Sequence, residues 1–331
     1  MRKIGPWKLG LVLCMGIACS ANSDKGEFGT GAGGNGTQHP QDAGTSGGSV
    51  QTGGGPVEDS GGLLLDAQVN TDSEPSNYCP HMDNEDHDGD GFSFEQGDCN
   101  DCDPNANPGA YDVFGGVDGG PGVDEDCNGI ADDEPIECDD GIDIASNDPM
   151  AAARAIGLCR VAVPNATGKD RTWGVLSAKY VKVDGTPGMN DLSHGILPKF
   201  GAANVQQGKT MLALSSGTAR APGQPGFSSP NGAIMGTNSA PPPGYPKESP
   251  ACPGVVTGPV FDPAALELVV RVPTNARSFS FNLNFYTFEF PEYICSEFND
   301  FYVTMMWPPP PWASGRQHLL RPRQQPHQCE Q

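Results

Sequence analysis

Aspartates recur at alternate positions in residues 86–92, a spacing that suits metal binding. Carboxylates stand at positions 1, 3 and 5 and glycine at position 6, as in a calcium loop of the EF-hand type. In such a loop alternating side chains point inward, the glycine permits the sharp turn, and position 7 offers its backbone carbonyl. The expected ligands are the carboxylates of Asp86, Asp88 and Asp90 and the carbonyl of Phe92.

A second stretch, residues 124–132, repeats the pattern with matches at positions 1, 3, 5, 6 and 9. Both stretches lack the bidentate glutamate that closes such a loop, since position 12 is Gly97 in the first and Pro135 in the second. Other oxygens of the same segment would have to complete the sites. The second-loop ligands would be Asp124, Asp126, Asn128, Asp132 and the Ile130 carbonyl, and the completing groups Asp98, Asp101, Asp103, Asp133 or Glu134.

The charge pattern supports a cation in this segment. The chain carries a formal net charge of −22, and no Lys or Arg lies between Lys25 and Arg154. Carboxylates at this density repel one another, so the segment needs either disorder or a cation to stay compact. Oxygen ligands favour calcium over zinc or copper, and we expect a structural ion with a dissociation constant on the order of 10⁻⁴–10⁻³ M. The same charge disfavours nucleic acid as a partner.

Two other chemistries stay open. His81, Met82 and His87 could form a copper site, because imidazole and thioether are softer ligands than carboxylate. Glu289 and Glu292 flank a Phe-Pro pair and could act as the carboxylate pair of a secreted glycosidase-like hydrolase. The sequence has no His-Glu-x-x-His or phosphate-loop motif, and we expect no enzyme.

The start of the chain has the character of an export signal. Arg2 and Lys3 precede a short apolar run over residues 9–18, which is too short to span a bilayer as a helix. Cys19 follows directly, and this arrangement resembles the lipobox of bacterial lipoproteins, although Gly16 stands where a larger aliphatic residue is usual. The resemblance implies lipidation of Cys19 and anchoring to the outer membrane at the cell surface. An ordinary signal peptide and a secreted protein are the alternative.

Cysteine usage agrees with export. Of the 11 cysteines, Cys14 would leave with the signal, Cys19 would carry lipid, and Cys329 lies in an atypical tail. The other eight suit four disulfide bonds in an oxidising compartment, and their pairing cannot be read from the sequence. The candidates are Cys79, Cys99, Cys102, Cys127, Cys138, Cys159, Cys252 and Cys295.

After residue 143 the pattern predicts one helix and then β structure. Residues 144–158 favour a helix that Asp148 caps and that has Pro149 in its first turn. Residues 172–183, 210–214, 266–272, 278–290 and 301–306 carry strand patterns. The clearest is 278–290, where apolar and polar residues alternate before the phase slips at a suspected bulge. Residues 308–331 are Pro/Arg-rich, and we interpret them as a reading-frame product rather than a natural tail.

Two family resemblances follow from these motifs. Residues 86–91, 97–104, 107–110 and 124–133 resemble, in order and spacing, the MopE-type metal-binding motif of bacterial surface proteins, many of them myxobacterial. Residues 155–159, 173–175, 193–196, 279–295 and 299–301 resemble the choice-of-anchor L domain. These resemblances imply surface display with a surface-protein or glycan ligand, and no reaction. Members of the second family usually continue with more strands, so this domain is expected to be incomplete.

A mainly β protein of five parts is therefore expected. They are an export signal (residues 1–18), lipidated Cys19 with a disordered Gly/Ser-rich tether (19–76), an acidic, cysteine-bearing calcium module (77–143), a β-sandwich-like domain (144–307) and the atypical tail (308–331).

Overall fold

The computed structural model describes residues 7–14, 64–67, 79–113, 122–131, 136–229, 235–242, 244–287, 291, 293–298 and 300–307. Several expectations lie outside these residues: lipidation of Cys19, most of the signal and tether, the roles of Asp132, Glu289 and Glu292, and the tail over 308–331. Within the described part, strands outnumber helices, so the mainly β fold is confirmed.

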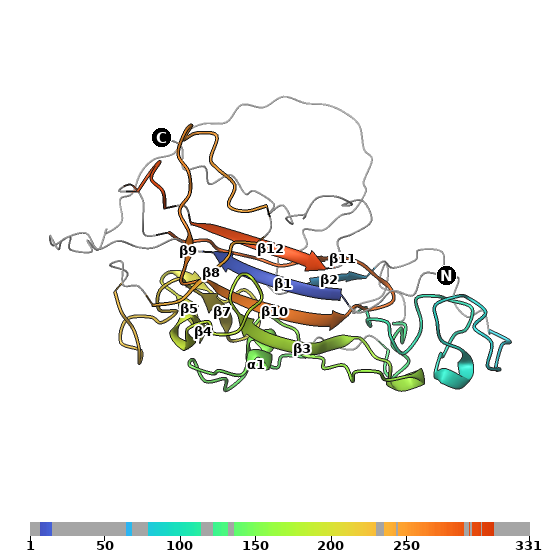
Figure 1. The fold of residues 1–331 in the computed structure, drawn as a ribbon. Coiled ribbons are helices and arrows are strands. Elements are labelled where there is room, and N and C mark those ends of the chain that lie inside the picture. Colours follow the sequence, from blue (N-terminus) through green and yellow to red (C-terminus); the bar gives the residue numbers. More distant parts are fainter. Residues whose placement is uncertain are drawn as a thin grey trace, which may run out of the picture.

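The largest sheet has four antiparallel strands in the order β12-β1-β10-β3 (Figure 1). The strands are β1 (Trp7–Cys14), β3 (Gly174–Val181), β10 (Ala264–Arg271) and β12 (Phe301–Trp307). β1 comes from the expected export signal, and it lies between two strands from the end of the described chain.

Four two-stranded sheets complete the β structure among the described residues. They pair β2 (Leu64–Ala67) with β11 (Ala276–Ser280), β4 (His194–Leu197) with β7 (Met211–Leu214), β5 (Lys199–Phe200) with β6 (Ala203–Asn204), and β8 (Asn238–Ser239) with β9 (Val260–Phe261). Three short 3₁₀ helices are η1 (Phe94–Gln96), η3 (Gly168–Asp170) and η4 (Asp191–Ser193).

Helix α1 (Pro149–Arg154) confirms the predicted capping and is shorter than the predicted span. The Asp148 carboxylate accepts a hydrogen bond of 2.9 Å from the Met150 amide, which satisfies one donor of the first turn. Three residues after its last residue, Gly157 takes a φ of 83°, a conformation that glycine adopts without strain. In the described part of the chain no helix is long and apolar enough to cross a membrane.

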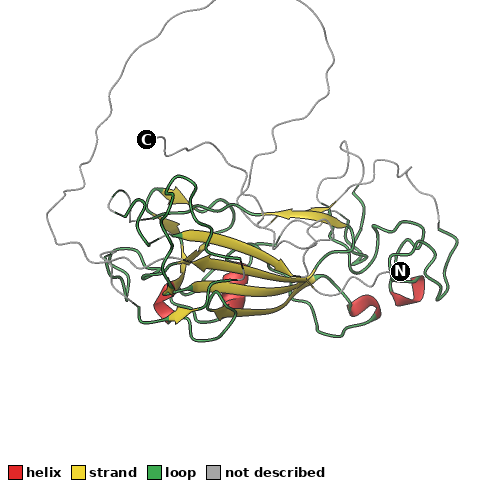
Figure 2. Cartoon of the chain, turned by 45° about the horizontal axis from the view of Figure 1, so that its top comes forward, coloured by secondary structure: helices red, strands yellow, loops and turns green. Residues whose placement is uncertain are grey.

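Both faces of the four-stranded sheet are covered by apolar residues. Helix α1 lies against one face (Figure 2). There its buried Ala152 and Ala153 pack with Val175, Leu266 and Leu268. On the other, Ala265 and Val303 pack with Val260, which comes from the long connection before β10. Burial of such side chains stabilises a fold by about 1.5–3 kcal/mol each relative to exposure. The four-stranded sheet therefore carries the hydrophobic core on which the other described elements are arranged.

The strand predictions hold in four places and fail in one. β3, β7, β10 and β12 lie where the patterns place them. The strand over residues 278–290 is wrong in extent, because β11 ends at Ser280 and residues 281–287 form no strand. Leu283, Phe285 and Tyr286 are exposed. The edge of β10 that a following strand would pair with is already paired with β1, so the alternating segment has no partner there.

Four disulfide bonds are present, as the eight candidate cysteines predict. They join Cys79 to Cys102, Cys99 to Cys127, Cys138 to Cys159, and Cys252 to Cys295. Two of the four lie within the acidic segment and a third joins it to Cys159, so this segment is cross-linked more densely than the sheet.

Candidate metal centre

The first aspartate-rich loop is shaped by its own carboxylates. The Asp86 carboxylate accepts hydrogen bonds from the Gly89 amide at 2.6 Å and the Gly91 amide at 3.0 Å. The Asp90 carboxylate accepts one from the Phe92 amide at 2.7 Å. Gly91 has a φ of 99°, so the sharp turn expected at this position is present. The three carboxylates of Asp86, Asp88 and Asp90 place oxygens within 4.8 Å of one another.

Phe92 fixes this loop to the rest of the segment. Its side chain is buried, and the Arg171 guanidinium lies 5.1 Å from the centre of its ring. Gly109 approaches the same ring so closely that a Cβ there would lie 3.1 Å from it. Phe92 was expected to contribute only its backbone carbonyl, but its side chain also forms the local core.

A second carboxylate cluster lies beside the loop and is formed by Asp88, Asp98 and Asp101, whose oxygens also come within 4.8 Å. Asp98 and Asp101 are each only 1% exposed. Each uses one oxygen to accept a backbone amide: Asp98 from Asn100 at 2.8 Å and Asp101 from His87 at 2.9 Å. Their second oxygens are buried without a hydrogen-bond partner, as are one oxygen each of Asp88 and Asp90.

Such oxygens are costly to bury. A desolvated carboxylate without a donor or cation loses its hydration and gains nothing in return. Burial and mutual repulsion raise the pKa of Asp88 and Asp98 to about 6 and that of Asp90 to about 8. Asp90 therefore holds a proton at neutral pH, and Asp88 and Asp98 take up protons in mild acid, unless a divalent cation replaces these protons.

Two disulfides hold these carboxylates in place. Cys99 and Cys102 flank Asp101, and their bonds to Cys127 and Cys79 tie this turn to both ends of the segment. Asp103 takes a local role, because its carboxylate accepts hydrogen bonds from the Asn105 amide and side chain.

The second aspartate-rich stretch is arranged differently. The Asp124 carboxylate accepts hydrogen bonds from the Asn128 and Gly129 amides, which reproduces the loop turn. The buried Asp126 carboxylate, however, pairs with the Arg160 guanidinium at 2.6 Å. Ile130 is 61% exposed. Among the described residues this stretch forms no cluster of three metal-ligating groups. The charge of Asp126 is balanced by an arginine instead.

The histidines considered for copper do meet. The rings of His81 and His87 stack at 3.7 Å, and the His87 imidazole lies 3.0 Å from the Asp83 carboxylate. This hydrogen bond raises the pKa of His87 and helps to lower that of Asp83. The neighbouring Met82 is 54% exposed. The group lies at the surface, in contrast to the buried carboxylates.

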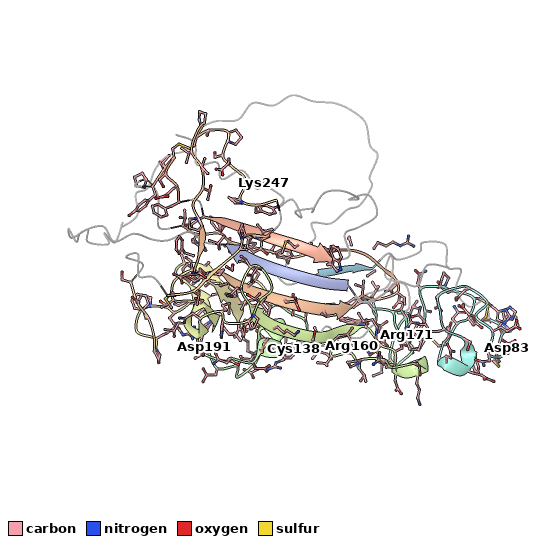
Figure 3. The ribbon with its side chains drawn as sticks, viewed as in Figure 1. Asp83, Cys138, Arg160, Arg171, Asp191 and Lys247 are labelled. Atoms are coloured by element: carbon pink, nitrogen blue, oxygen red, sulfur yellow. A yellow bond between two sulfur atoms is a disulfide. The ribbon has the colours of Figure 1, made fainter. Side chains whose placement is uncertain are left out.

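Sequence reasoning missed the basic residues that dock the acidic segment on the sheet. Arg160 lies 5.5 Å from the Trp173 ring while it pairs with Asp126, and the Arg171 guanidinium lies over the Phe92 ring. Figure 3 shows both arginines at the end of the sheet that is nearer to the acidic segment. At the other end of the segment, buried Asp139 accepts hydrogen bonds from the Lys209 and Thr210 amides, both at 2.7 Å. The available signal was that these arginines are among the first cations after a long run of uncompensated acid.

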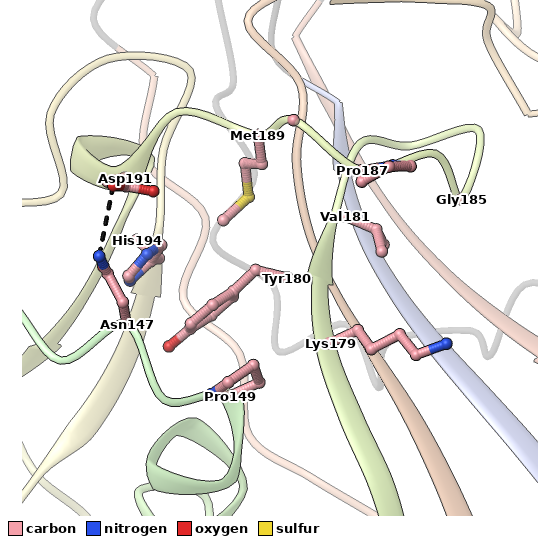
Figure 4. A pocket seen from close by; sticks show the side chains of 11 residues that line it. Asn147, Pro149, Lys179, Tyr180, Val181, Gly185, Pro187, Met189, Asp191 and His194 are labelled. Atoms are coloured by element: carbon pink, nitrogen blue, oxygen red, sulfur yellow. Dashed lines mark hydrogen bonds between the residues drawn. The ribbon is translucent and has the colours of Figure 1, made fainter.

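A cleft of about 580 Å³ is lined by Tyr180, Met189 and His194 among others (Figure 4). The His194 ring stacks on Tyr180 at 3.8 Å. Burial and the nearby Arg220 lower the pKa of His194 to about 4, so the imidazole is neutral.

No family model matches the chain, and neither the curated proteins nor the solved structures contain a match to it.

Proposed function

We propose that this protein is an exported, calcium-binding surface lipoprotein with a structural or adhesive role and no catalytic activity. The observation that carries the proposal is the convergence of Asp88, Asp98 and Asp101, two of them fully buried, each with a carboxylate oxygen that no protein donor satisfies. A hard divalent cation with oxygen ligands suits such a site, and calcium tolerates its irregular geometry.

The ion would act by replacing hydrophobic burial. The acidic segment contributes few large apolar side chains to the core, Phe92 being the exception. A cation at the cluster would offset the burial, and the weaker mutual repulsion, that raise the pKa values of Asp88, Asp90 and Asp98. At a concentration one hundred times its dissociation constant, the ion would stabilise the folded chain by about 2.7 kcal/mol.

Export is supported by the four disulfides, since such bonds persist in oxidising compartments. In this proposal Cys19 carries the lipid, residues 20–76 act as a tether, and the β portion is a sandwich-like domain that presents a surface for a protein or glycan ligand. The membrane is then a partner through the anchor alone.

Isothermal titration of the full chain with calcium tests the metal proposal. We expect saturable binding for the wild type and a loss of at least tenfold in affinity for the double variant Asp98→Asn, Asp101→Asn. Glu95→Gln is the matched control, because Glu95 is exposed in the same segment and belongs to neither cluster. Equal affinity in all three proteins would contradict the site.

Copper is a second candidate, supported by the stacked pair of His81 and His87 beside Asp83. Competition separates the two metals. If copper binds without displacing calcium and His87→Gln abolishes only copper binding, the two sites are distinct. The hydrolase alternative stays a sequence hypothesis, since Glu289 and Glu292 lie outside the described residues.

A further inference from the structure

Strand β1 lies between β10 and β12 and pairs with both of them. Its residues Trp7 to Leu13 oppose residues of β10, and Lys8 to Cys14 oppose residues of β12, both antiparallel. β10 and β12 consequently run in the same direction with a reversed strand between them (Figure 1). Without β1, each would present an edge of unpaired backbone groups in the middle of the sheet.

The same residues form the apolar part of the expected export signal. Cleavage before Cys19 would remove β1 and leave the position between β10 and β12 vacant. A vacant position of this kind has a strong preference for another extended segment, because backbone pairing would be restored on two sides.

A segment with the required direction lies in the chain between these two strands. Residues 272–275 connect β10 to β11, a length suited to a hairpin connection. A hairpin closed by Arg271 opposite Ala276 would run antiparallel to β10, and the chain from residue 284 to 300 is long enough to return to β12. The segment over residues 276–283 would thus take the direction that β1 now has.

The side-chain pattern fits as well. In this register Phe279, Phe281 and Leu283 come opposite Leu268, Leu266 and Ala264, which are buried and are now opposed by Leu9, Leu11 and Leu13. Directly opposed residues of antiparallel strands share a face, so apolar residues replace apolar residues at three successive positions. Ser280 comes opposite Glu267 on the other, more polar face.

In the full chain, residues 276–283 make few pairing and packing contacts. β11 pairs only with the short β2, and beyond it Leu283, Phe285 and Tyr286 are 40–51% exposed. The connection before it is held firmly, because the Asn275 carboxamide accepts a hydrogen bond from the Tyr111 amide and Thr274 bonds to Asn107 and Gly109. The segment can therefore swing about residues 276–277 while its turn stays fixed.

We propose that residues 276–283 replace β1 as the central strand when the N-terminal segment is removed. The precursor and the processed protein then have different sheets, and the exposed apolar residues of the precursor become core. The proposal rests on the proposed export, because cleavage is the event that vacates the position. It does not depend on calcium.

Hydrogen exchange measured by mass spectrometry tests the exchange of strands. We would compare the full chain, the full chain carrying Leu11→Lys, and the chain starting at Ser20. A lysine in the central strand expels β1 without any export or cleavage, so this variant keeps the test independent of the lipoprotein assignment. We expect amides of residues 279–283 to become at least about 100-fold more protected in the second and third proteins.

A matched pair of substitutions adds a second measurement. In the chain starting at Ser20, Phe281→Lys should lower the thermal midpoint by about 5 °C or more, and Ser280→Lys should change it by less than about 2 °C. Unchanged exchange of residues 279–283 with β3 and β10 still protected would overturn the proposal. So would loss of protection throughout β3 and β10, because the vacated position would then have no internal occupant.

Discussion

The Arg160 guanidinium donates a 2.6 Å hydrogen bond to the Asp126 carboxylate, whose side chain is almost fully buried. This contact joins the acidic segment to the residues that lead into β3. The arginine balances the charge of a carboxylate that the loop pattern assigns to a metal ion.

Removal of this arginine should destabilise the protein. Arg160→Gln leaves the Asp126 carboxylate buried without its cation, and we expect a loss of about 2 kcal/mol in the free energy of unfolding, measured by urea denaturation. Lys209→Gln is the control, because Lys209 and Asp140 form an exposed pair that should contribute less than about 1 kcal/mol. Equal losses would show that the buried pair has no special role.

Calcium should stabilise the protein more at alkaline than at acidic pH. The raised pKa values of Asp88, Asp90 and Asp98 mean that the folded, ion-free protein holds protons that the unfolded chain has released. Its stability is therefore lost as pH rises from about 4 to about 8. Calcium replaces these protons, so the difference in thermal midpoint between calcium and EDTA should be small at pH 5 and large at pH 8.5. A constant difference would contradict the cluster as the binding site.

His194 should make the protein sensitive to acid. Its pKa is lowered to about 4 from the ordinary 6.5, so the unfolded chain binds a proton between these values and the folded chain does not. Stability is present above pH 6.5 and is lost as pH falls toward 4. His194→Phe, which retains a ring against Tyr180, should flatten thermal midpoints across this range. The pKa of His87 is raised instead, so its contribution to stability is present at acidic pH and is lost as pH rises. His87→Gln should therefore lower the thermal midpoint at acidic pH more than at alkaline pH.

Phe92 should be required for both stability and calcium affinity. Phe92→Ala creates a cavity beside Gly109 and removes the contact with Arg171, at an expected cost of about 3–4 kcal/mol. Because the loop would no longer be fixed, calcium affinity should fall as well. Phe94→Ala is the matched control two residues away, since Phe94 is 41% exposed and should change stability by less than about 1 kcal/mol.

Local sequence patterns predicted what local physics controls. The cap of α1 at Asp148, the turn at Gly91 and strands β3, β10 and β12 follow from short-range rules of capping and alternation. The convergence of Asp98 and Asp101 on Asp88 was anticipated only as a set of candidates, because it depends on which cysteines pair.

Contacts between residues far apart in the sequence could not be predicted from such short-range rules. The pairing of Asp126 with Arg160 decides that the second stretch differs from the first, and nothing in the spacing of either residue signals it. The strand over residues 278–290 failed for the same reason. Its alternation is genuine, and whether it pairs depends on what occupies the neighbouring position, which is β1.

The bonds between Cys79 and Cys102 and between Cys99 and Cys127 overlap along the chain. If the molecule is pulled from its two ends, tension passes across the first bond, back along three residues and across the second. The 49 residues from Cys79 to Cys127 would otherwise extend to roughly 160 Å, whereas this route spans about 20 Å. Residues 79–127 therefore behave as a nearly inextensible link, and any extension under load must come from the chain on either side of them.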